Sequence, residues 1–212
     1  IIDRITEASE NKKDHGVRQG AMFCVEGLAL SLARLFDPYA ANCTPLLLQA
    51  FSDPKREVQT AASSASKEMM KQLSGPGVKQ VLPKVLEGIK DKQWRTKLGS
   101  IELLAAMTNC MPKQLAACLP QVVPALCGVI NDQHNKVKEA AREAIDKVGS
   151  IITSPELKAL APELISALTD GAQHEHITKD VLDKLLGTSF VHHVDAPSLS
   201  LVCPLVQRAL KE

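Results

Sequence analysis

The feature that most constrains the fold of this chain is a ten-residue pattern that recurs along all 212 residues. One copy reads LPKVLEGIKD and runs from Leu82 to Asp91. The other four copies are TPLLLQAFSD, VPALCGVIND, APELISALTD and CPLVQRALKE. The prolines of the five copies are Pro45, Pro83, Pro124, Pro162 and Pro204, which gives steps of 38, 41, 38 and 42 residues.

Each copy has the pattern of an amphipathic helix. Apolar residues stand two and six positions after the proline, as Val85 and Ile89 do in the second copy, and this spacing places them on one helical face. An acidic residue stands eight positions after the proline: Asp53, Asp91, Asp132, Asp170 or Glu212. We expect it to end the first helix and to cap the next one by accepting from free backbone N–H groups.

A second helical pattern follows the acidic residue. After Asp53 it contains Val58, Ala61, Ala62 and Ala65, and the same order of valine and alanines returns after Asp132. Small residues allow paired helices to approach closely. A period of about 40 residues built from two helices is typical of HEAT or armadillo solenoids. The sequence therefore predicts an all-α HEAT-repeat solenoid, a right-handed superhelix of antiparallel helix pairs.

The repeats predict one array over residues 1–212 rather than separate domains. We place a partial repeat at 1–35, repeats at about 36–74, 75–110, 111–153 and 154–188, and a partial repeat at 189–212. The second helix of the unit at 154–188 lacks the valine and alanine pattern, and the last segment supplies one helix without a partner. The chain begins at Ile1 and stops within a repeat, so we expect a piece of a longer array.

Composition argues against several classes of binding partner. Aromatic residues are only 3% of the chain, which disfavours stacking platforms for single-stranded nucleic acid. The 25 basic and 24 acidic residues nearly balance, so overall charge favours neither DNA nor a membrane surface as a partner. No uninterrupted apolar run reaches the ~18 residues of a membrane span, and no signal peptide is visible. We expect a cytoplasmic protein with no membrane or DNA partner.

No constellation of residues predicts catalysis. The six cysteines form no C-x-x-C pair and are interpreted as reduced core residues of a cytosolic protein. His174, His176, His192 and His193 lack a ligand set at metal-binding spacing, and no phosphate-binding glycine motif occurs. We therefore expect no enzyme activity, no cofactor and no metal site.

Basic residues recur just after the turn between paired helices, and they are the candidate site. They are Lys55 and Arg56, then Lys92, Arg95 and Lys97, then Lys136, Lys138 and Arg142, with Trp94 among them. Stacked repeats would align them along one edge, which could hold RNA phosphates or an acidic protein tail. The alternative is a solvated edge with local ion pairs, each worth under ~1 kcal/mol. Trp94 is either a packing anchor or a binding contact.

Several longer segments resemble one family of translational regulators. They are HGVRQGAMF (15–23), RLFDPY (34–39), WRTKLGSIELLAAM (94–107), CMPKQLAACLPQVVPAL (110–126) and FVHHVDAPSLSLVCPLVQRAL (190–210). These segments are similar to the general control translational activators, very large HEAT-repeat proteins that work with the kinase of initiation factor 2 alpha. The similarity covers essentially the whole chain and extends to the HEAT domain of translation elongation factor 3.

The resemblance implies a non-catalytic scaffold on the ribosome that senses stalled or colliding ribosomes and uncharged tRNA. It implies the ribosome, with its RNA and proteins, and an ATP-binding-cassette protein as partners. It places binding of the kinase in other regions of the full-length protein. It transfers no catalytic residue and no nucleotide hydrolysis. Two other hypotheses remain open from the residues alone: a HEAT adaptor for transport or tubulin binding, and an enzyme without a recognisable active site.

Overall fold

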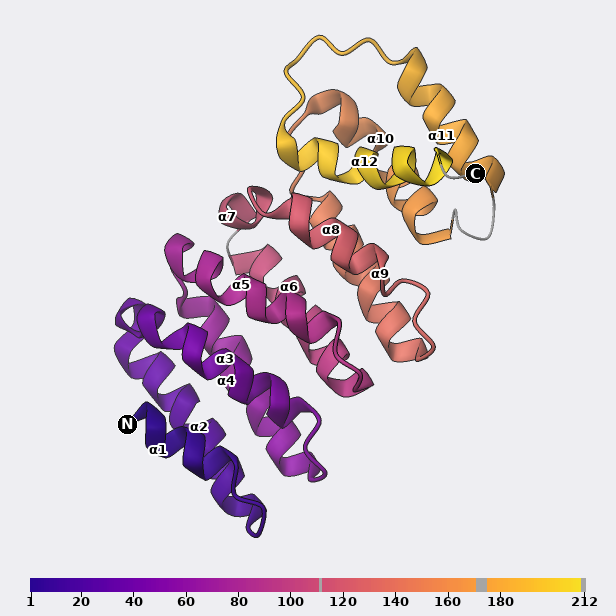
Figure 1. Ribbon diagram of the computed structural model, residues 1–212. Helices are drawn as coiled ribbons and strands as arrows, with labels where there is room; N and C mark the ends of the chain where they lie inside the picture. The colour runs from indigo at the N-terminus through magenta and orange to yellow at the C-terminus, as the bar shows by residue number, and fades with distance from the viewer. Residues whose placement is uncertain (111, 171–174, 211–212) are drawn as a thin grey trace. The chain divides into compact units, whose positions relative to one another are not determined.

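The computed structural model describes residues 1–110, 112–170 and 175–210, and the regular elements in this part are all helices (Figure 1). The chain folds into two compact units, Ile1–Met111 and Pro112–Glu212, each with its own core. The all-α, HEAT-repeat fold expected from the repeats is therefore confirmed. The prediction of a single array with the repeat boundaries given above stays a prediction.

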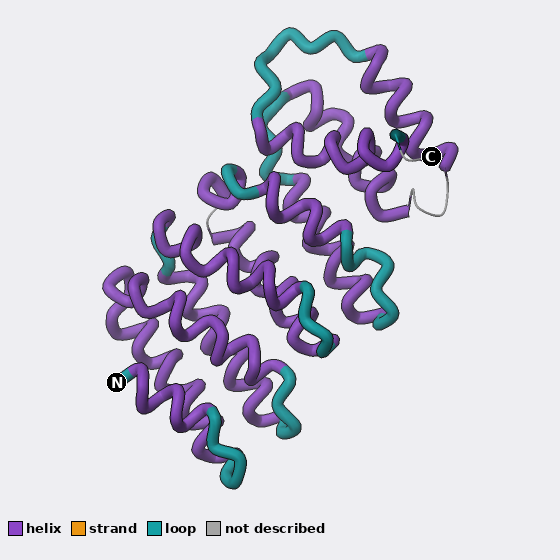
Figure 2. The backbone as a smooth tube through the Cα atoms, in the orientation of Figure 1, coloured by secondary structure: helices purple, strands orange, loops and turns teal. Residues whose placement is uncertain are grey.

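Unit 1 consists of three antiparallel helix pairs that stack side by side (Figures 1 and 2). Its helices are α1 (Ile2–Ser9), α2 (His15–Leu32), α3 (Asp37–Phe51), α4 (Arg56–Gln72), α5 (Gly75–Ile89) and α6 (Trp94–Cys110). The first helices, α1, α3 and α5, pack in one row, and the second helices, α2, α4 and α6, pack in the other. The valine and alanine pattern fulfils its predicted role, because Val58, Ala61, Ala62 and Ala65 are all buried in α4.

Two prolines, rather than one, lie in each of the first helices α3 and α5. Pro38 and Pro76 lie in the first turns of α3 and α5, where the missing N–H has no intrahelical acceptor in any case. The repeat prolines Pro45 and Pro83 lie seven residues further along, inside the same helices, and both are exposed. Because seven residues make nearly two helical turns, each pair of prolines faces the same side, away from the core.

The acidic residue of the repeat does not cap the next helix as predicted at Asp53, Asp91 and Asp132. Oδ1 of Asp53 accepts from the N–H of Lys55 at 2.8 Å, and Asp91 and Asp132 accept from Gln93 and His134 at 2.7 and 2.9 Å. Each acceptor therefore closes a small turn ahead of the helix, since Lys55 and His134 are themselves the N-cap residues. A short aspartate side chain reaches its own turn more easily than the helical N–H groups beyond it.

Helix α2 stops at Leu32, and a 3-10 turn, η1 (Ala33–Phe36), follows it. Ala33 has a φ of 47° and a ψ of −122°, which breaks the helix and sends Leu35 outward, 75% exposed, while Phe36 turns into the core.

The stretch His15–Phe51, which contains α2, η1 and α3, needs a further correction. By length and composition it is apolar enough to cross a membrane, although the sequence was expected to contain no such stretch. Interspersed glycine, serine and single charged residues hide it from a search for uninterrupted apolar runs. Helices in the cores of soluble proteins and signal sequences have the same composition, so this observation assigns no membrane location.

Unit 2 contains α7 (Pro112–Ala116), α8 (Leu119–Cys127), α9 (Asn135–Gly149), α10 (Pro155–Asp170), α11 (Glu175–Gly187) and α12 (Ala196–Ala209). Helix α12, the one helix expected in the last segment, packs against α8 and α10, with Leu201 and Leu205 fully buried. Arg208 donates to the carbonyl oxygen of Ala167 at 2.9 Å and thereby satisfies an end of α10. Helix α10 in turn packs on α9.

The connection between α11 and α12 is held to the start of α10. Glu156 accepts from the backbone N–H groups of Val191 and His192, and its Oε1 lies 2.8 Å from Nδ1 of His192. These contacts, led by the one with the His192 side chain, lower the pKa of Glu156 to about 2. Thr153 donates to Asp195, the N-cap residue of α12, at 2.7 Å. The segment therefore follows a defined path although it has no regular structure.

Candidate functional site

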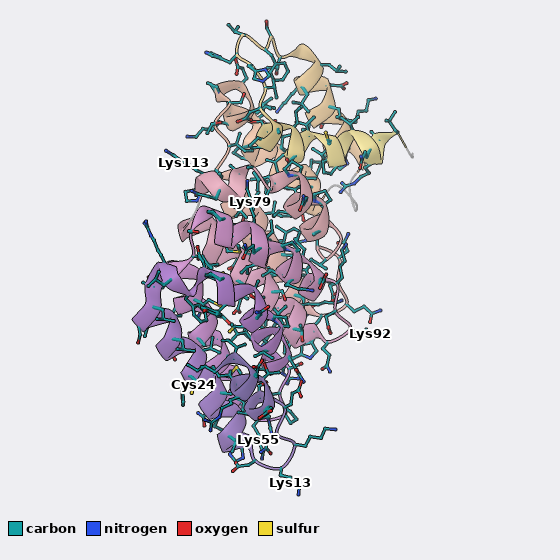
Figure 3. All side chains as sticks on the ribbon, turned by 60° about the vertical axis from the view of Figure 1, so that its left-hand side comes forward. Lys13, Cys24, Lys55, Lys79, Lys92 and Lys113 are labelled. Carbon is teal, nitrogen blue, oxygen red and sulfur yellow. The ribbon has the colours of Figure 1, made fainter. Side chains whose placement is uncertain are left out.

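The predicted basic residues of unit 1 lie on and after the turns that join paired helices. Lys55 lies in the α3–α4 turn and Lys92 in the α5–α6 turn, while Arg56 and Arg95 lie in the first turns of α4 and α6. All four side chains are exposed. Figure 3 shows Lys55 and Lys92 at the same edge of unit 1, where the loops of the helix pairs lie side by side in Figure 2. The structure therefore brings these cations together on one edge.

The first turn of unit 1 adds cations that the sequence analysis missed. The α1–α2 turn carries Lys12 and Lys13, both exposed, and Lys13 lies at the same edge as Lys55 (Figure 3). Oδ1 of Asn11 accepts from the N–H groups of Lys13 and Asp14, at 2.9 and 3.0 Å, in place of the aspartate of later turns. An asparagine that follows a helical pattern and precedes a second helix was the available signal.

We call the exposed cations of this edge the turn edge: Lys13, Lys55, Arg56, Lys92 and Arg95. The other two predicted residues of unit 1, Trp94 and Lys97, are half-buried. The guanidinium carbon of Arg95 lies 4.5 Å from the ring centroid of Trp94. The tryptophan thus serves as a platform that holds the arginine at the edge, and the cation–π contact gives Trp94 a role between the two alternatives of the sequence analysis.

An ion pair ties the turn edge together beneath the surface. Arg18 of α2 donates from Nε to Oδ2 of Asp53 at 2.6 Å and from Nη2 to Oδ1 at 3.0 Å, and it also donates to the carbonyl oxygen of Asn11. Burial by itself would raise the pKa of Asp53, but the hydrogen bonds from Arg18 and from the Lys55 N–H outweigh it and hold the pKa below its usual value. The bidentate pair fixes one turn against the next.

In unit 2 the three predicted residues lie on α9. Lys136 and Arg142 are exposed and Lys138 is half-buried. Arg142 donates to Oδ1 of Asp170, at the end of α10, at 3.0 Å, so its charge is shared with a neighbouring helix. Because both partners are more than 40% exposed, this pair contributes little stability. This ion pair joins two helices, whereas the alternative of a solvated edge assumed local ion pairs.

The described part of the chain shows no grouping for metal or nucleophilic chemistry. Among these residues, no three His, Cys, Asp or Glu side chains come together as a metal site would need. His174 lies outside the described residues. Burial raises the pKa of both Cys43 and Cys127 to about 11, which keeps these thiols protonated and unreactive at neutral pH. Cys24 and Cys203 are exposed, which corrects the expectation that all six cysteines lie in the core.

Stacked antiparallel helix pairs, joined by short turns that an aspartate or asparagine side chain closes, define a HEAT-repeat protein. A family model described as the elongation factor 3 N-terminal HEAT repeat matches residues 1–145, and one described as the elongation factor 3/GNC1 HEAT repeat matches residues 175–212. The chain belongs to the elongation factor 3 and GCN1 family of HEAT-repeat proteins.

Curated relatives align along the whole chain. The stalled ribosome sensor GCN1 of Homo sapiens is 46% identical over 212 residues, all of this chain and 8% of the relative. The eIF-2-alpha kinase activator GCN1 of Saccharomyces cerevisiae is 37% identical over the same span and also 8% covered. Elongation factor 3 of Gonapodya prolifera is 31% identical over 214 residues, with 19% of it covered. The chain therefore spans less than a tenth of its GCN1 relatives.

A solved structure agrees with the fold. A chain in a study titled "Structural Basis of Microtubule Plus End Tracking by XMAP215, CLIP-170 and EB1" superimposes with a TM-score of 0.65 at 22% identity. The superposition covers 92% of this chain and 76% of that one. At this identity the likeness concerns the fold alone, so it carries no argument for tubulin binding.

Proposed function

We propose that this chain is a non-catalytic scaffold segment in translational control, which associates with the ribosome and supports activation of the initiation factor 2 alpha kinase when ribosomes stall. The observation that carries the proposal is the 46% identity, over every residue of the chain, to a protein described as a stalled ribosome sensor. The similarity to elongation factor 3 adds a second translation protein built on the same repeats. The proposed location is the cytoplasm.

The ribosome contact is proposed to be the turn edge of unit 1. Lys13, Lys55 and Lys92 each extend from a successive turn, and exposed cations at regular intervals suit the phosphates of ribosomal RNA. Lys97, Lys136, Lys138 and Arg142 are secondary candidates because they are half-buried, paired or in the other unit. The kinase is proposed to bind other regions of the full-length protein, and an ATP-binding-cassette protein is a further proposed partner.

Co-sedimentation with purified ribosomes over a salt series tests the contact. The edge variant carries Lys13→Glu, Lys55→Glu and Lys92→Glu, and a control of equal charge carries Arg34→Glu, Lys67→Glu and Lys79→Glu. The control residues are exposed and lie toward the other ends of the helices. We expect salt-sensitive binding by the natural chain and the control, and a loss of about tenfold or more in the edge variant.

Equal binding by the two variants would refute the turn edge as the contact. Absence of ribosome binding by the natural chain would refute the ribosome proposal for this segment. We expect each variant to keep its helices, because these side chains are exposed and make no contact on which the core depends. Circular dichroism of each variant checks this.

A further inference from the structure

Two neighbouring hollows lie along the turns of unit 1. They have volumes of about 630 and 680 Å³ and share Gln49, Ser52 and Gln93 in their walls. The first reaches from the α1–α2 turn to the α3–α4 turn, and the second continues between α3 and α5 to the α5–α6 turn. We call this combined depression the groove. It overlaps the turn edge at Lys92 alone, since Lys13, Lys55, Arg56 and Arg95 do not line it.

The floor of the groove is apolar. Met22, Leu46 and Val58 form the bottom of the first hollow, and Leu48 and Gly88 form that of the second. All five residues are buried, so only small parts of their surfaces reach the groove, where they offer shallow apolar seats. No aromatic side chain lines either hollow. This chemistry suits aliphatic side chains and gives nucleobases nothing to stack on.

Two primary amides stand in the middle of the groove. Gln49 and Gln93 are exposed, line both hollows, and their side chains make no hydrogen bond within the described residues. Each amide offers an N–H₂ donor and a carbonyl acceptor together. A peptide bond presents the complementary acceptor and donor, so an amide side chain can bind an extended backbone through both groups at once. An RNA backbone has no such donor at its phosphates.

The charge of the groove walls favours an acidic occupant. Lys12, Lys90 and Lys92 are exposed on its walls, and none forms an ion pair within the described residues. Arg18 and Lys84 are neutralised by Asp53 and Glu87. The remaining wall carboxylates are those of Glu10 and Asp91, and Asp91 already accepts from the Gln93 N–H. The three cations without an ion pair therefore outnumber these two carboxylates by one, which leaves the walls with a net positive charge.

We propose that the groove binds an extended, acidic protein segment that carries aliphatic residues. The segment lies across the three turns, its backbone is held by Gln49 and Gln93, its aliphatic side chains enter the two hollows, and its carboxylates face Lys12, Lys90 and Lys92. This binding does not depend on the ribosome contact proposed above. It gives unit 1 a second recognition surface beside the turn edge, with a protein rather than RNA as its partner.

Fluorescence anisotropy with the 212-residue chain tests the groove directly. The probe is a labelled synthetic peptide of aspartate and leucine, and the comparison probes are its lysine and leucine counterpart, its backbone N-methylated form, and a single-stranded RNA of equal charge. We expect the acidic peptide to bind, and the lysine peptide and the RNA not to bind. N-methylation should weaken binding about tenfold, because it removes the donors that the two amides need.

Matched substitutions separate the groove from its surroundings. The variant with Gln49→Ala and Gln93→Ala should bind the acidic peptide about tenfold more weakly, whereas Gln72→Ala with Gln80→Ala, on α4 and α5 outside the groove, should change binding less than about twofold. Lys55→Glu with Arg56→Glu should weaken ribosome binding but leave peptide affinity within about threefold, so failure of one proposal is distinguishable from failure of the other.

Three results would overturn the proposal. They are undetectable binding of the acidic peptide, equal affinity for the N-methylated peptide, and unchanged affinity in the variant without the two groove amides. Tighter binding of the RNA, with loss in that same variant, would assign the groove to nucleic acid instead and would also refute it.

Discussion

Glycines at helix crossings hold the repeats at close range. A Cβ placed on Gly99 of α6 would lie 2.3–2.6 Å from ring carbons of Phe51 in α3, and one on Gly149 of α9 would lie 2.3 Å from Cδ1 of Ile165 in α10. By contrast, a Cβ on Gly27 of α2 would meet nothing within 4 Å. The same residue type therefore has opposite roles in different helices of this chain.

These contacts predict the effect of one methyl group. Gly99→Ala should lower the free energy of unfolding by about 1–3 kcal/mol, because the rigid Phe51 ring lies in a packed core and has to move. Gly27→Ala is the matched control and should be neutral or raise stability by up to about 1 kcal/mol through helix propensity. Urea unfolding followed by circular dichroism measures both, and equal effects would contradict the packing argument.

The Arg18–Asp53 pair predicts a pH dependence of stability. The folded pKa of Asp53 lies below its unfolded value, so at acid pH the unfolded chain binds more protons and stability rises with pH. The stabilisation is therefore present above about pH 4 and is lost as pH falls through the folded pKa. The side chains of Arg18 and Asp53 are 15% and 8% exposed, which limits screening by water.

Arg18→Gln and Asp53→Asn are the variants that test this dependence. Each should lower the unfolding free energy at neutral pH by about 1–3 kcal/mol, the range for hydrogen bonds to charged groups. Each should also flatten the loss of stability below about pH 4 that the natural chain shows. Urea unfolding at a series of pH values is the measurement. A variant that retains the natural slope would show that Asp53 is not responsible for it.

At the scale of elements, the end of α2 stores backbone strain. Ala33 adopts a positive φ that side chains rarely tolerate, and it does so because Phe36 enters the core and Asp37 accepts from the backbone N–H of Ser74 at 3.0 Å. The position requires the conformational freedom of glycine, yet the chain has alanine there. The burial of Phe36 and the Asp37 contact, which links α3 to the start of α5, together outweigh this cost.

Ala33→Gly should therefore stabilise the protein by about 1 kcal/mol, because relief of strain exceeds the added entropy of the unfolded chain. Ala29→Gly, at a fully buried position one turn earlier in α2, should instead destabilise it by about 1 kcal/mol or more. Thermal unfolding of the two variants gives the comparison. A fall in Tm with Ala33→Gly would show that the turn has no strain to release.

At the scale of the whole molecule, the division into two units predicts two unfolding events. Each unit has a core of its own, and repeat proteins gain stability mainly from contacts between neighbours. Trp94, the single tryptophan, lies in unit 1. Its fluorescence should therefore report unit 1, whereas circular dichroism reports helices of both units.

Urea unfolding followed by both signals should give curves that do not coincide. Gly99→Ala should shift the fluorescence curve and one part of the dichroism curve. Leu201→Ala should shift only the other part of the dichroism curve, since Leu201 is fully buried in unit 2. Coincident curves that both variants displace equally would mean that the units unfold as one.

Much of this protein was determined by local sequence. The spacing of the repeat prolines and the valine and alanine pattern predicted the helix pairs, because an amphipathic helix can be recognised from the periodicity of its own apolar residues. The same spacing placed Lys55 and Lys92 in turns. Local pattern also misled where side-chain reach decided the outcome, as at Asp53, whose carboxylate closes its own turn instead of capping α4.

Other features depended on residues far apart in the chain, and only the tertiary structure decided them. Arg18 meets Asp53 across 35 positions, and α12 packs on α8 and α10. The groove exists because three turns are held side by side, which puts Gln49 and Gln93 in one wall. Sequence periodicity sets which face of a helix is buried, but the distances between helices follow from packing, and these distances create the ion pair, the buried glycines and the groove.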